Sequence, residues 1–143
     1  MLRPAASPPL LALPAGLVPV GEHPFRVPWA KTWRSKVEQD PLKEQVRQAS
    51  GLTSHRPDGR TYLFVIRVYW SQELTGSKKA RQRPDVENAA KIITDAFTGY
   101  LYEDDDLRFV CGVQTECFGV SDAASEHTDV WIFALPSRPS PAP

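Results

Sequence analysis

Residues 61–70, with the sequence TYLFVIRVYW, constrain the fold more than any other part of the chain. The segment is rich in β-branched and aromatic residues, which favour strands, and nearly all of it is apolar. A strand that is apolar on both faces is typical of a central, covered position in a sheet. We therefore expect a sheet built around residues 61–70, with helices packed on it.

The segments around this strand carry alternating strand and helix patterns. They predict a strand with a break at 17–27, a helix at 41–48, a turn at 55–60, an amphipathic helix at 86–97, and strands at 107–118 and 128–135. The resulting order is strand, helix, strand, helix, strand, strand. It predicts an α/β (α+β) fold, a mixed β-sheet of about four strands packed with two main helices.

The first helix has recognisable end signals. Asp40 is a suitable N-cap, and Pro41 would occupy the favoured first helical position. Gly51 is expected to end the helix. The pattern also allows an earlier start, near Lys36.

Length and proline content predict the domain organisation. A chain of 143 residues fits a single domain, here expected at residues 17–135. The Pro-rich residues 1–16 are expected to form a disordered extension, and the Pro-rich residues 136–143 an extended tail. A formal net charge of zero argues against a protein that coats nucleic acid non-specifically.

The expected compartment and thiol state follow from the lack of a membrane-spanning segment and from the low number of cysteines. No segment is long and apolar enough to span a bilayer, so the expected localisation is cytoplasmic by default. The two cysteines, Cys111 and Cys117, are too few for a disulfide scaffold. Both fall in a predicted strand, and we expect them to be reduced, buried or half-buried thiols.

Carboxylates stand on both sides of the helix at 86–97. Asp85 and Glu87 lie at its start, and an acidic run at 103–106 follows it. Phosphodiester cleavage by Mg²⁺ uses such oxygen ligands, because the metal polarises the phosphate and lowers the pKa of a water molecule. A helix of this length spans about 18 Å, so the chain must double back if the two groups are to meet.

The same residues allow a structural interpretation. Asp85 could serve only as an N-cap, and Glu87, Lys91 and Asp95 could form an exposed ion-paired stripe at four-residue spacing. The acidic run could be a solvated loop. Against this, four like charges in succession are unfavourable unless a cation or a basic partner relieves them.

The stretch from Arg83 to Phe97, followed by Glu-Asp-Asp-Asp, resembles the signature of the RusA family of Holliday junction resolvases. That signature reads Asp-x-Asp-Asn-x-x-Lys-x-x-x-Asp-x-Leu, then a gap, then an Asp-Asp pair that leads into a strand. The motif covers about 27 residues of this chain, with a weaker likeness over most of the body. Matching residues of the signature are Asp85, Glu87, Asn88, Lys91 and Asp95.

The resemblance implies roles for these residues. Asp85, Glu87 and Asp106, with Asp105 in support, would hold Mg²⁺ or Mn²⁺, and Lys91 would stabilise the phosphate or the leaving group. The Asp-Asp pair can be aligned at Asp104-Asp105 or at Asp105-Asp106, and the following Phe-Val favours the second alignment. Glu87 departs from the family's usual Asp, which puts metal geometry and rate in doubt but leaves a carboxylate in place.

Basic residues lead directly into the acidic cluster. They are Lys78, Lys79, Arg81 and Arg83, and with Asn88 they are candidates for contacting a DNA backbone. A flexible solubilising loop is the alternative. A second basic and aromatic patch contains Lys31, Arg34, Lys36, Trp29 and Trp33, whose indoles could stack on unpaired bases or could belong to the core. The three histidines share no metal-ligand spacing and receive no role.

The sequence therefore predicts a metal-dependent endodeoxyribonuclease that resolves four-way DNA junctions by paired symmetric nicks in recombination and repair. The resemblance implies a homodimer, whose two-fold symmetry would match that of the junction. Two alternatives remain open. The chain could be a non-catalytic module that binds branched DNA, or a protein-interaction domain whose Pro-rich tails dock partners.

Overall fold

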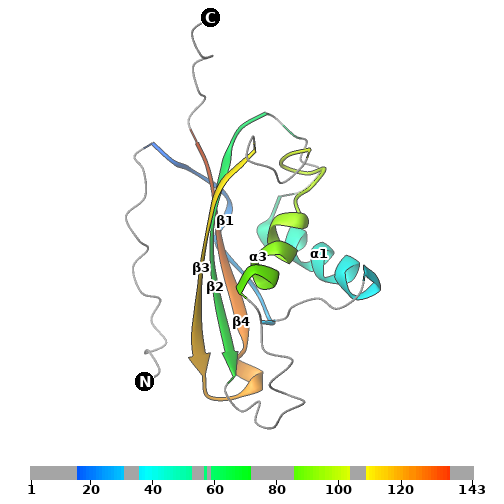
Figure 1. Cartoon of the computed structure of the whole chain (residues 1–143), viewed down its shortest axis with the longest axis vertical. Helices are drawn as coiled ribbons and strands as arrows, with labels where there is room; N and C mark the ends of the chain where they lie inside the picture. Colours follow the sequence, from blue (N-terminus) through cyan, green and yellow to red (C-terminus); the bar gives the residue numbers. More distant parts are fainter. Residues whose placement is uncertain are drawn as a thin grey trace, which may run out of the picture.

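The computed structural model describes residues 16–30, 36–52, 57, 59–71, 86–103 and 109–135, with only the backbone at 36–38 and 86–89 and at position 123. The elements in chain order are β1 (Val18–Val27), α1 (Lys36–Ser50), β2 (Tyr62–Ser71), α3 (Val86–Asp95), β3 (Val110–Val120), the short 3-10 helix η1 (Ala123–Ser125) and β4 (His127–Ala134). Figure 1 shows one twisted sheet with both helices against the same face. The predicted mixed sheet with two helices is confirmed.

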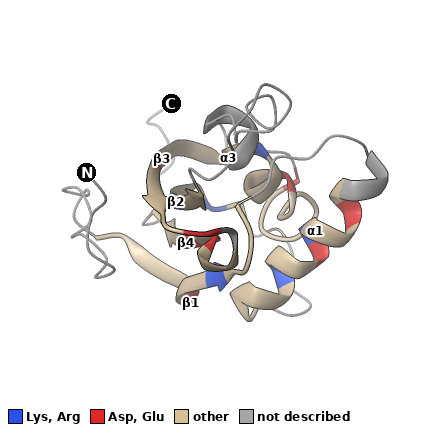
Figure 2. Cartoon of the chain, turned by 90° about the horizontal axis from the view of Figure 1, so that it is seen from below, with Lys and Arg blue, Asp and Glu red and all other residues tan. Residues whose placement is uncertain are grey.

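Strand β2 occupies the interior of the sheet, as its composition predicts. The strand order is β1-β4-β2-β3, with β2 parallel to β3 and antiparallel to β4. Every residue from Tyr62 to Val68 is buried. The parallel pair β2 and β3 is joined by a crossover that contains α3, and Figure 2 shows α1 and α3 on one side of the sheet.

The main core lies between the sheet and the two helices. Alternate residues of β2, such as Phe64 and Ile66, point toward the helices and are fully buried. Helix α3 contributes Ile92 and Ile93, and Phe97 just beyond its end packs against Phe64 at 6.0 Å between ring centroids. Ile93, Ala96 and Phe97 follow the three- and four-residue spacing of the apolar face that the sequence predicts for residues 86–97, and Ile92 adds to it.

A smaller cluster lies on the opposite face of the sheet. It consists of Leu63, Val65, Trp131 and Phe133. Because successive side chains of a strand point to opposite faces, β2 supplies both clusters.

The start of α1 corrects one expectation. The helix begins at Lys36, so Asp40 is not its N-cap and Pro41 lies inside it. The earlier start that the sequence also allowed is the one observed. Val46 of α1 is fully buried, and packing of this kind outweighs the local preference of proline for the first position. The predicted end is confirmed, because Gly51 has a φ of 73° directly after the helix.

Two further expectations need correction. Strand β3 begins at Val110 rather than at residue 107, after Phe109 in a turn. Cys111 and Cys117 lie in β3 as predicted and are free thiols. Both residues are exposed, and the Cys117 thiol is partly buried. Strand β3 is an edge strand, so its side chains are covered less than those of β2. No helix in the described part of the chain has the length and apolar character needed to cross a membrane.

Candidate functional site

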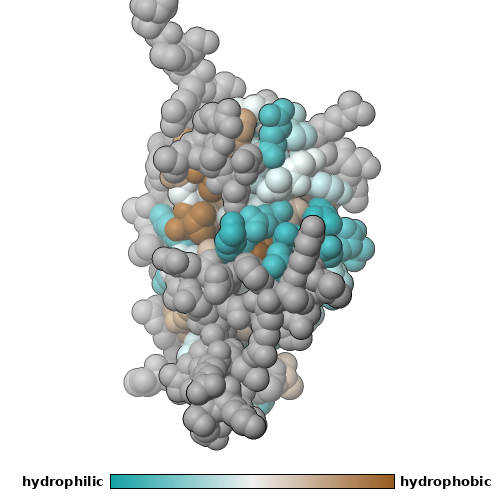
Figure 3. All heavy atoms as spheres, turned by 45° about the vertical axis from the view of Figure 1, so that its right-hand side comes forward, coloured by the Kyte–Doolittle hydropathy of each residue, from teal (hydrophilic) through white to brown (hydrophobic). Residues whose placement is uncertain are grey.

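Helix α3 carries the predicted active-site stripe on the face turned away from the core. Ile92 and Ile93 are buried against the sheet, whereas Lys91 is exposed, with 54% of its side-chain surface accessible. Positions 87, 91 and 95 follow one another at four-residue spacing within the helix, so they share this outer face. Figure 3 shows hydrophilic residues gathered on the helix-bearing side of the molecule.

Lys91 is held by the next residue of the same stripe. Its Nζ atom lies 3.4 Å from Oδ1 of Asp95, in an i,i+4 pair. A solvent-exposed pair at this distance contributes little to stability. It does keep the ammonium group on the outer face of α3, where an incoming phosphate could reach it. The predicted exposed ion pair is therefore present for Lys91 and Asp95, and it is compatible with a role for Lys91 toward DNA.

The chain reverses direction directly after α3. Gly99 has a φ of 81°, and its N–H donates to the carbonyl of Tyr102 at 2.7 Å. The hydroxyl of Tyr102 then donates to the carbonyl of Thr94 at 2.5 Å. These bonds bring Tyr102 back beside the last turn of α3, and Glu103 emerges exposed at that place. The chain thus turns back at the C-terminal end of α3, and the approach of the acidic run to Asp85 and Glu87 stays a prediction.

The returning segment is anchored at the end of the sheet where β2 begins. The ring of Tyr102 lies 6.0 Å from that of Tyr62, the first residue of β2. The N–H of Tyr62 donates to the carbonyl of Phe109 at 2.7 Å, so the chain enters β3 at the same end. Helix α3 has ten residues and thus spans about 15 Å. Tyr102 and Glu103 therefore lie at the opposite end of this helix from position 87.

Most of the predicted ligands fall outside the described residues. These are Asp85, Asp104, Asp105 and Asp106, together with the basic residues Lys78, Lys79, Arg81 and Arg83. Glu87 and Asn88 lie in the first turns of α3, where only the backbone is described. Within the described ranges, no group of three or more His, Cys, Asp or Glu side chains could hold a metal ion. The ligand set stays a prediction.

The type of side chain in the predicted ligand set can still be compared with what a divalent metal requires. Position 87 lies four residues before the exposed Lys91 in α3, and a glutamate there supplies a carboxylate. Carboxylate oxygens are ligands that Mg²⁺ prefers. The residues therefore fit a divalent metal in kind.

Trp29 belongs to the core and not to a base-stacking surface. Its residue exposure is 8%, and its indole Nε1–H donates to Oε1 of Gln45 in α1 at 2.6 Å. Of the two interpretations of this patch, the structural one is correct for Trp29. Lys31, Trp33 and Arg34 lie outside the described residues, and for Lys36 only the backbone is described.

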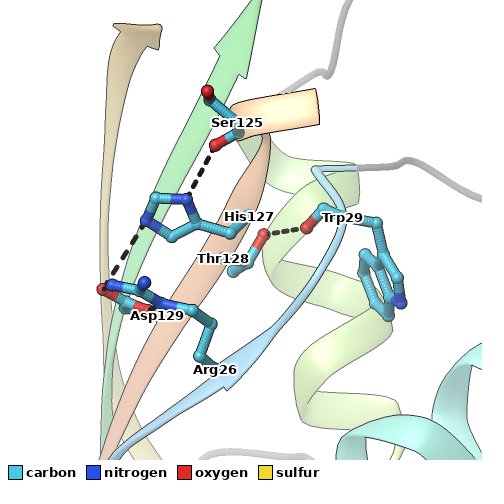
Figure 4. A network of polar contacts seen from close by, with 6 residues as sticks. All are labelled: Arg26, Trp29, Ser125, His127, Thr128 and Asp129. Carbon is cyan, nitrogen blue, oxygen red and sulfur yellow. Dashed lines mark hydrogen bonds and ion pairs between the residues drawn. The ribbon is translucent and has the colours of Figure 1, made fainter. Parts of the chain in front are cut away.

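A polar network at the β1–β4 border was not anticipated from the sequence (Figure 4). Arg26 donates from Nε to Oδ1 of Asp129 at 2.7 Å and from a terminal nitrogen to Oδ2 at 3.0 Å. This bond is the main cause of a raised pKa for Arg26. His127 lies beside the pair, with Nε2 at 3.9 Å from Oδ2 of Asp129. Arg26 and Asp129 are 103 residues apart in sequence, so no local pattern connects them.

Strand pairing thus buries the carboxylate of this ion pair, whereas the Arg26 side chain is 61% exposed. Asp129 is 1% exposed, and the opposite residue on β2, Arg67, is also 1% exposed. Arg67 in turn pairs with Glu116 of β3 at 3.7 Å. The four residues form one row of alternating charge across the whole sheet, which satisfies charges that would otherwise be costly to bury.

Comparison with known proteins identifies the family. The fold and the sequence define a class of domain. It is a mixed α/β domain with a lysine on the outer face of a helix and carboxylates in the adjoining segments. The family described as endodeoxyribonuclease RusA matches residues 23–127, which is most of the chain. The protein belongs to the RusA endodeoxyribonuclease family, and the resemblance found in the sequence is confirmed.

Other comparisons add little. No curated protein matches the chain. Among solved structures it is similar to TubZ of Bacillus thuringiensis serovar israelensis, in a GTPγS-form protofilament, with 12% identity and a TM-score of 0.42. That match covers 82% of this chain and 25% of the TubZ chain. At this score the likeness supports no conclusion about function.

Proposed function

We propose that this protein resolves four-way DNA junctions by paired symmetric nicks, as a homodimer that uses Mg²⁺ or Mn²⁺, in recombination and repair in the cytoplasm. Membership of the RusA endodeoxyribonuclease family carries the proposal. The exposed position of Lys91 on the outer face of α3 supports it from the structure.

Within the proposed site, we assign different roles to the carboxylates, to Lys91 and to the basic residues. Asp85, Glu87 and Asp106, with Asp105 in support, would hold the divalent ion. When bound, that ion would supply Lewis-acid polarisation of the phosphate and a more acidic water molecule. Lys91 would place its positive charge beside the phosphate as negative charge develops on it, with Asp95 orienting the ammonium group. Lys78, Lys79, Arg81, Arg83 and Asn88 would position the DNA backbone.

The test is cleavage of a synthetic four-way junction by the full chain in the presence of Mg²⁺. Asp85→Asn removes one negative ligand charge while nearly keeping its size, and we expect it to lower the rate by on the order of 10²-fold or more. Lys91→Ala should lower the rate by a factor on the order of 10 to 10². Lys91→Arg should recover part of that loss because it keeps the charge.

Lys43→Ala provides a matched control, because Lys43 lies on α1 rather than on the proposed site. It should cleave like the unmodified protein. Unchanged cleavage by Asp85→Asn would contradict the assignment of the acidic site. Junction binding without nicks, at equal strength with and without Mg²⁺, would instead favour the non-catalytic branched-DNA module. Equal binding to junctions and linear duplexes would favour the interaction domain.

A further inference from the structure

The two edge strands of the sheet differ in how well they are protected against pairing with another chain. Among the described residues, β1 pairs only with β4, and β3 pairs only with β2. Edge strands expose unpaired backbone N–H and C=O groups, which proteins protect with proline, charged residues, bulges or short strand length. A long edge strand without these features is a surface on which another strand can pair.

Strand β1 has several of the protective features. It contains Pro19 and Pro24, which have no N–H to donate, and the charged residues Glu22 and Arg26. Its register with β4 also shifts between Val20 and Phe25. Continuous pairing of a further strand along β1 is therefore disfavoured.

Strand β3 has fewer of them. Its register with β2 shifts once, at its start, where Val110 pairs with Tyr62 and Gly112 with Leu63, and it is regular from Gly112 to Val120. It runs for 11 residues, VCGVQTECFGV, without proline, and Glu116 is its one charged residue. Glu116 already pairs with Arg67 of the neighbouring strand at 3.7 Å. Val113 is 40% exposed, which is unusual for a large apolar residue of this structure.

Gln114 lies near the middle of this strand with an unsatisfied acceptor. Its Oε1 atom is buried and accepts no hydrogen bond from a described residue. A buried acceptor without a donor is unfavourable, so a rotation of this amide that lets a partner strand supply a donor would be favourable. Two Gln114 side chains that face each other could supply that donor reciprocally, because each amide carries both a donor and an acceptor.

We propose that β3 pairs antiparallel with β3 of a second copy of this chain, across a two-fold axis at Gln114, to form one continuous sheet. In that register each residue lies opposite its mirror position about 114. Glu116 then faces Gly112 of the second copy, so the charged residue meets no side chain. Val113 faces Thr115, and Cys111, which lies at the register shift between Val110 and Gly112, is opposite Cys117. The inference names an interface for the proposed homodimer and does not depend on nuclease activity.

The first experiment compares the two edges with one substitution. Val113→Lys places like charges at diagonal positions across the proposed interface, and should raise the dimer dissociation constant by at least about tenfold in analytical ultracentrifugation. Val18→Lys is the matched control on the β1 edge, where Val18 is 49% exposed. It should leave the dissociation constant unchanged. Both substitutions are at exposed positions, so circular dichroism should show an unchanged fold.

The second experiment tests the register through the free cysteines. In the single-cysteine variants Cys111→Ser and Cys117→Ser, the remaining thiol has no partner opposite it, whereas an equal mixture of the two can form a Cys111–Cys117 bridge between chains. Opposed residues of antiparallel strands lie within disulfide range. Oxidation should be done at mildly alkaline pH, because partial burial raises the pKa of the Cys117 thiol. Cross-linked dimer should form in the mixture and not with either variant alone.

Each result decides the proposal. A monomeric unmodified protein, or a dimer that Val18→Lys weakens and Val113→Lys does not, would overturn the interface. Efficient cross-linking of one single-cysteine variant with itself would overturn the register at Gln114. Junction cleavage measured on the same samples would show separately whether the proposed nuclease function holds.

Discussion

One face of the sheet is covered by α1 and α3 and stays apolar along β2, whereas the opposite face changes from apolar to charged halfway along the same strand. On the helix-covered face, β2 contributes Tyr62, Phe64, Ile66 and Val68. On the opposite face it contributes Leu63 and Val65, followed by Arg67 and Tyr69.

The difference shows two ways of stabilising a buried row. On the helix-covered face, side chains from distant elements fill the space, and the gain is proportional to the apolar area removed from water. On the opposite face, Arg67 and Asp129 are buried at 1% exposure and require partners on neighbouring strands. Stability should therefore depend on side-chain volume on the helix-covered face, and on hydrogen-bond and ion-pair partners on the opposite face.

Removal of a large side chain gives the largest expected effect. Phe97 is fully buried between Phe64 and Phe25, so Phe97→Ala leaves a cavity and should lower the free energy of unfolding by about 3–5 kcal/mol. Phe118→Ala removes the same side chain from the opposite face, where it is only partly buried, and should cost about 1–2 kcal/mol. Urea denaturation of both variants measures the difference.

Equal costs for the two phenylalanine variants would contradict this comparison. Phe97→Leu provides a control for the helix-covered face, because it keeps most of the apolar volume. It should lose clearly less stability than Phe97→Ala. A loss as large as that of the alanine variant would show that ring shape, and not volume, holds this face together.

Removal of a partner tests the charged row. Arg26→Met keeps the length and apolar stem of the side chain but removes both hydrogen bonds to Asp129, whose carboxylate stays buried. Arg26 itself is 61% exposed, so solvent replaces part of the interaction, and we expect a loss of about 1–2 kcal/mol. Thermal or urea unfolding measures it.

The control for this variant is Glu44→Gln on α1. Glu44 accepts a bond from Arg47 at 2.6 Å, and this bond lowers the pKa of Glu44, but the carboxylate is solvent-exposed. Solvent screens such a pair, so its removal should change stability little. A loss equal to that of Arg26→Met would show that burial of Asp129 does not strengthen the Arg26 pair.

Much of the fold could be predicted from the sequence because its signals are local. The apolar segment 61–70 indicated the central strand, and the spacing of Ile93 and Phe97 indicated the buried face of α3. The same reasoning failed where tertiary contacts outweigh local preference, as at Pro41 inside α1. It also could not show that Arg26 and Asp129 meet, because strand order brings them together across 103 residues.

The candidate site could be predicted in part. The four-residue spacing of Lys91 and Asp95 correctly predicted an exposed ion pair on α3. The chain turns back at Gly99 and Tyr102, at the C-terminal end of this helix. Convergence of Asp85 and Glu87 with the acids at 104–106 stays a prediction. No periodic pattern determines the path of a loop that carries several like charges, because it depends on the ions and partners that neutralise them.

The smallest expected effect is a pH dependence that originates at the apolar cluster on the face opposite the helices. His23 packs edge-on against Phe133 at 4.6 Å, and its burial lowers its pKa below the ordinary value of 6.5. The unfolded chain therefore takes up a proton at His23 at higher pH than the folded chain does. Consequently, the free energy of unfolding should fall as the pH drops below 6.5 and level off once folded His23 is also protonated.

Substitution of His23 isolates this contribution from that of other titrating groups. His23→Phe cannot be protonated and keeps an aromatic ring against Phe133. Between about pH 7.5 and about pH 5.5, the unmodified protein should lose more stability in urea denaturation than the variant does, because only the former gains a proton on unfolding. An identical loss in both proteins would show that His23 titrates alike in the folded and unfolded states. Water would then reach His23 well enough to solvate a charged imidazole beside Phe133. The apolar cluster of Leu63, Val65, Trp131 and Phe133 would be less well sealed from water than the helix-covered core.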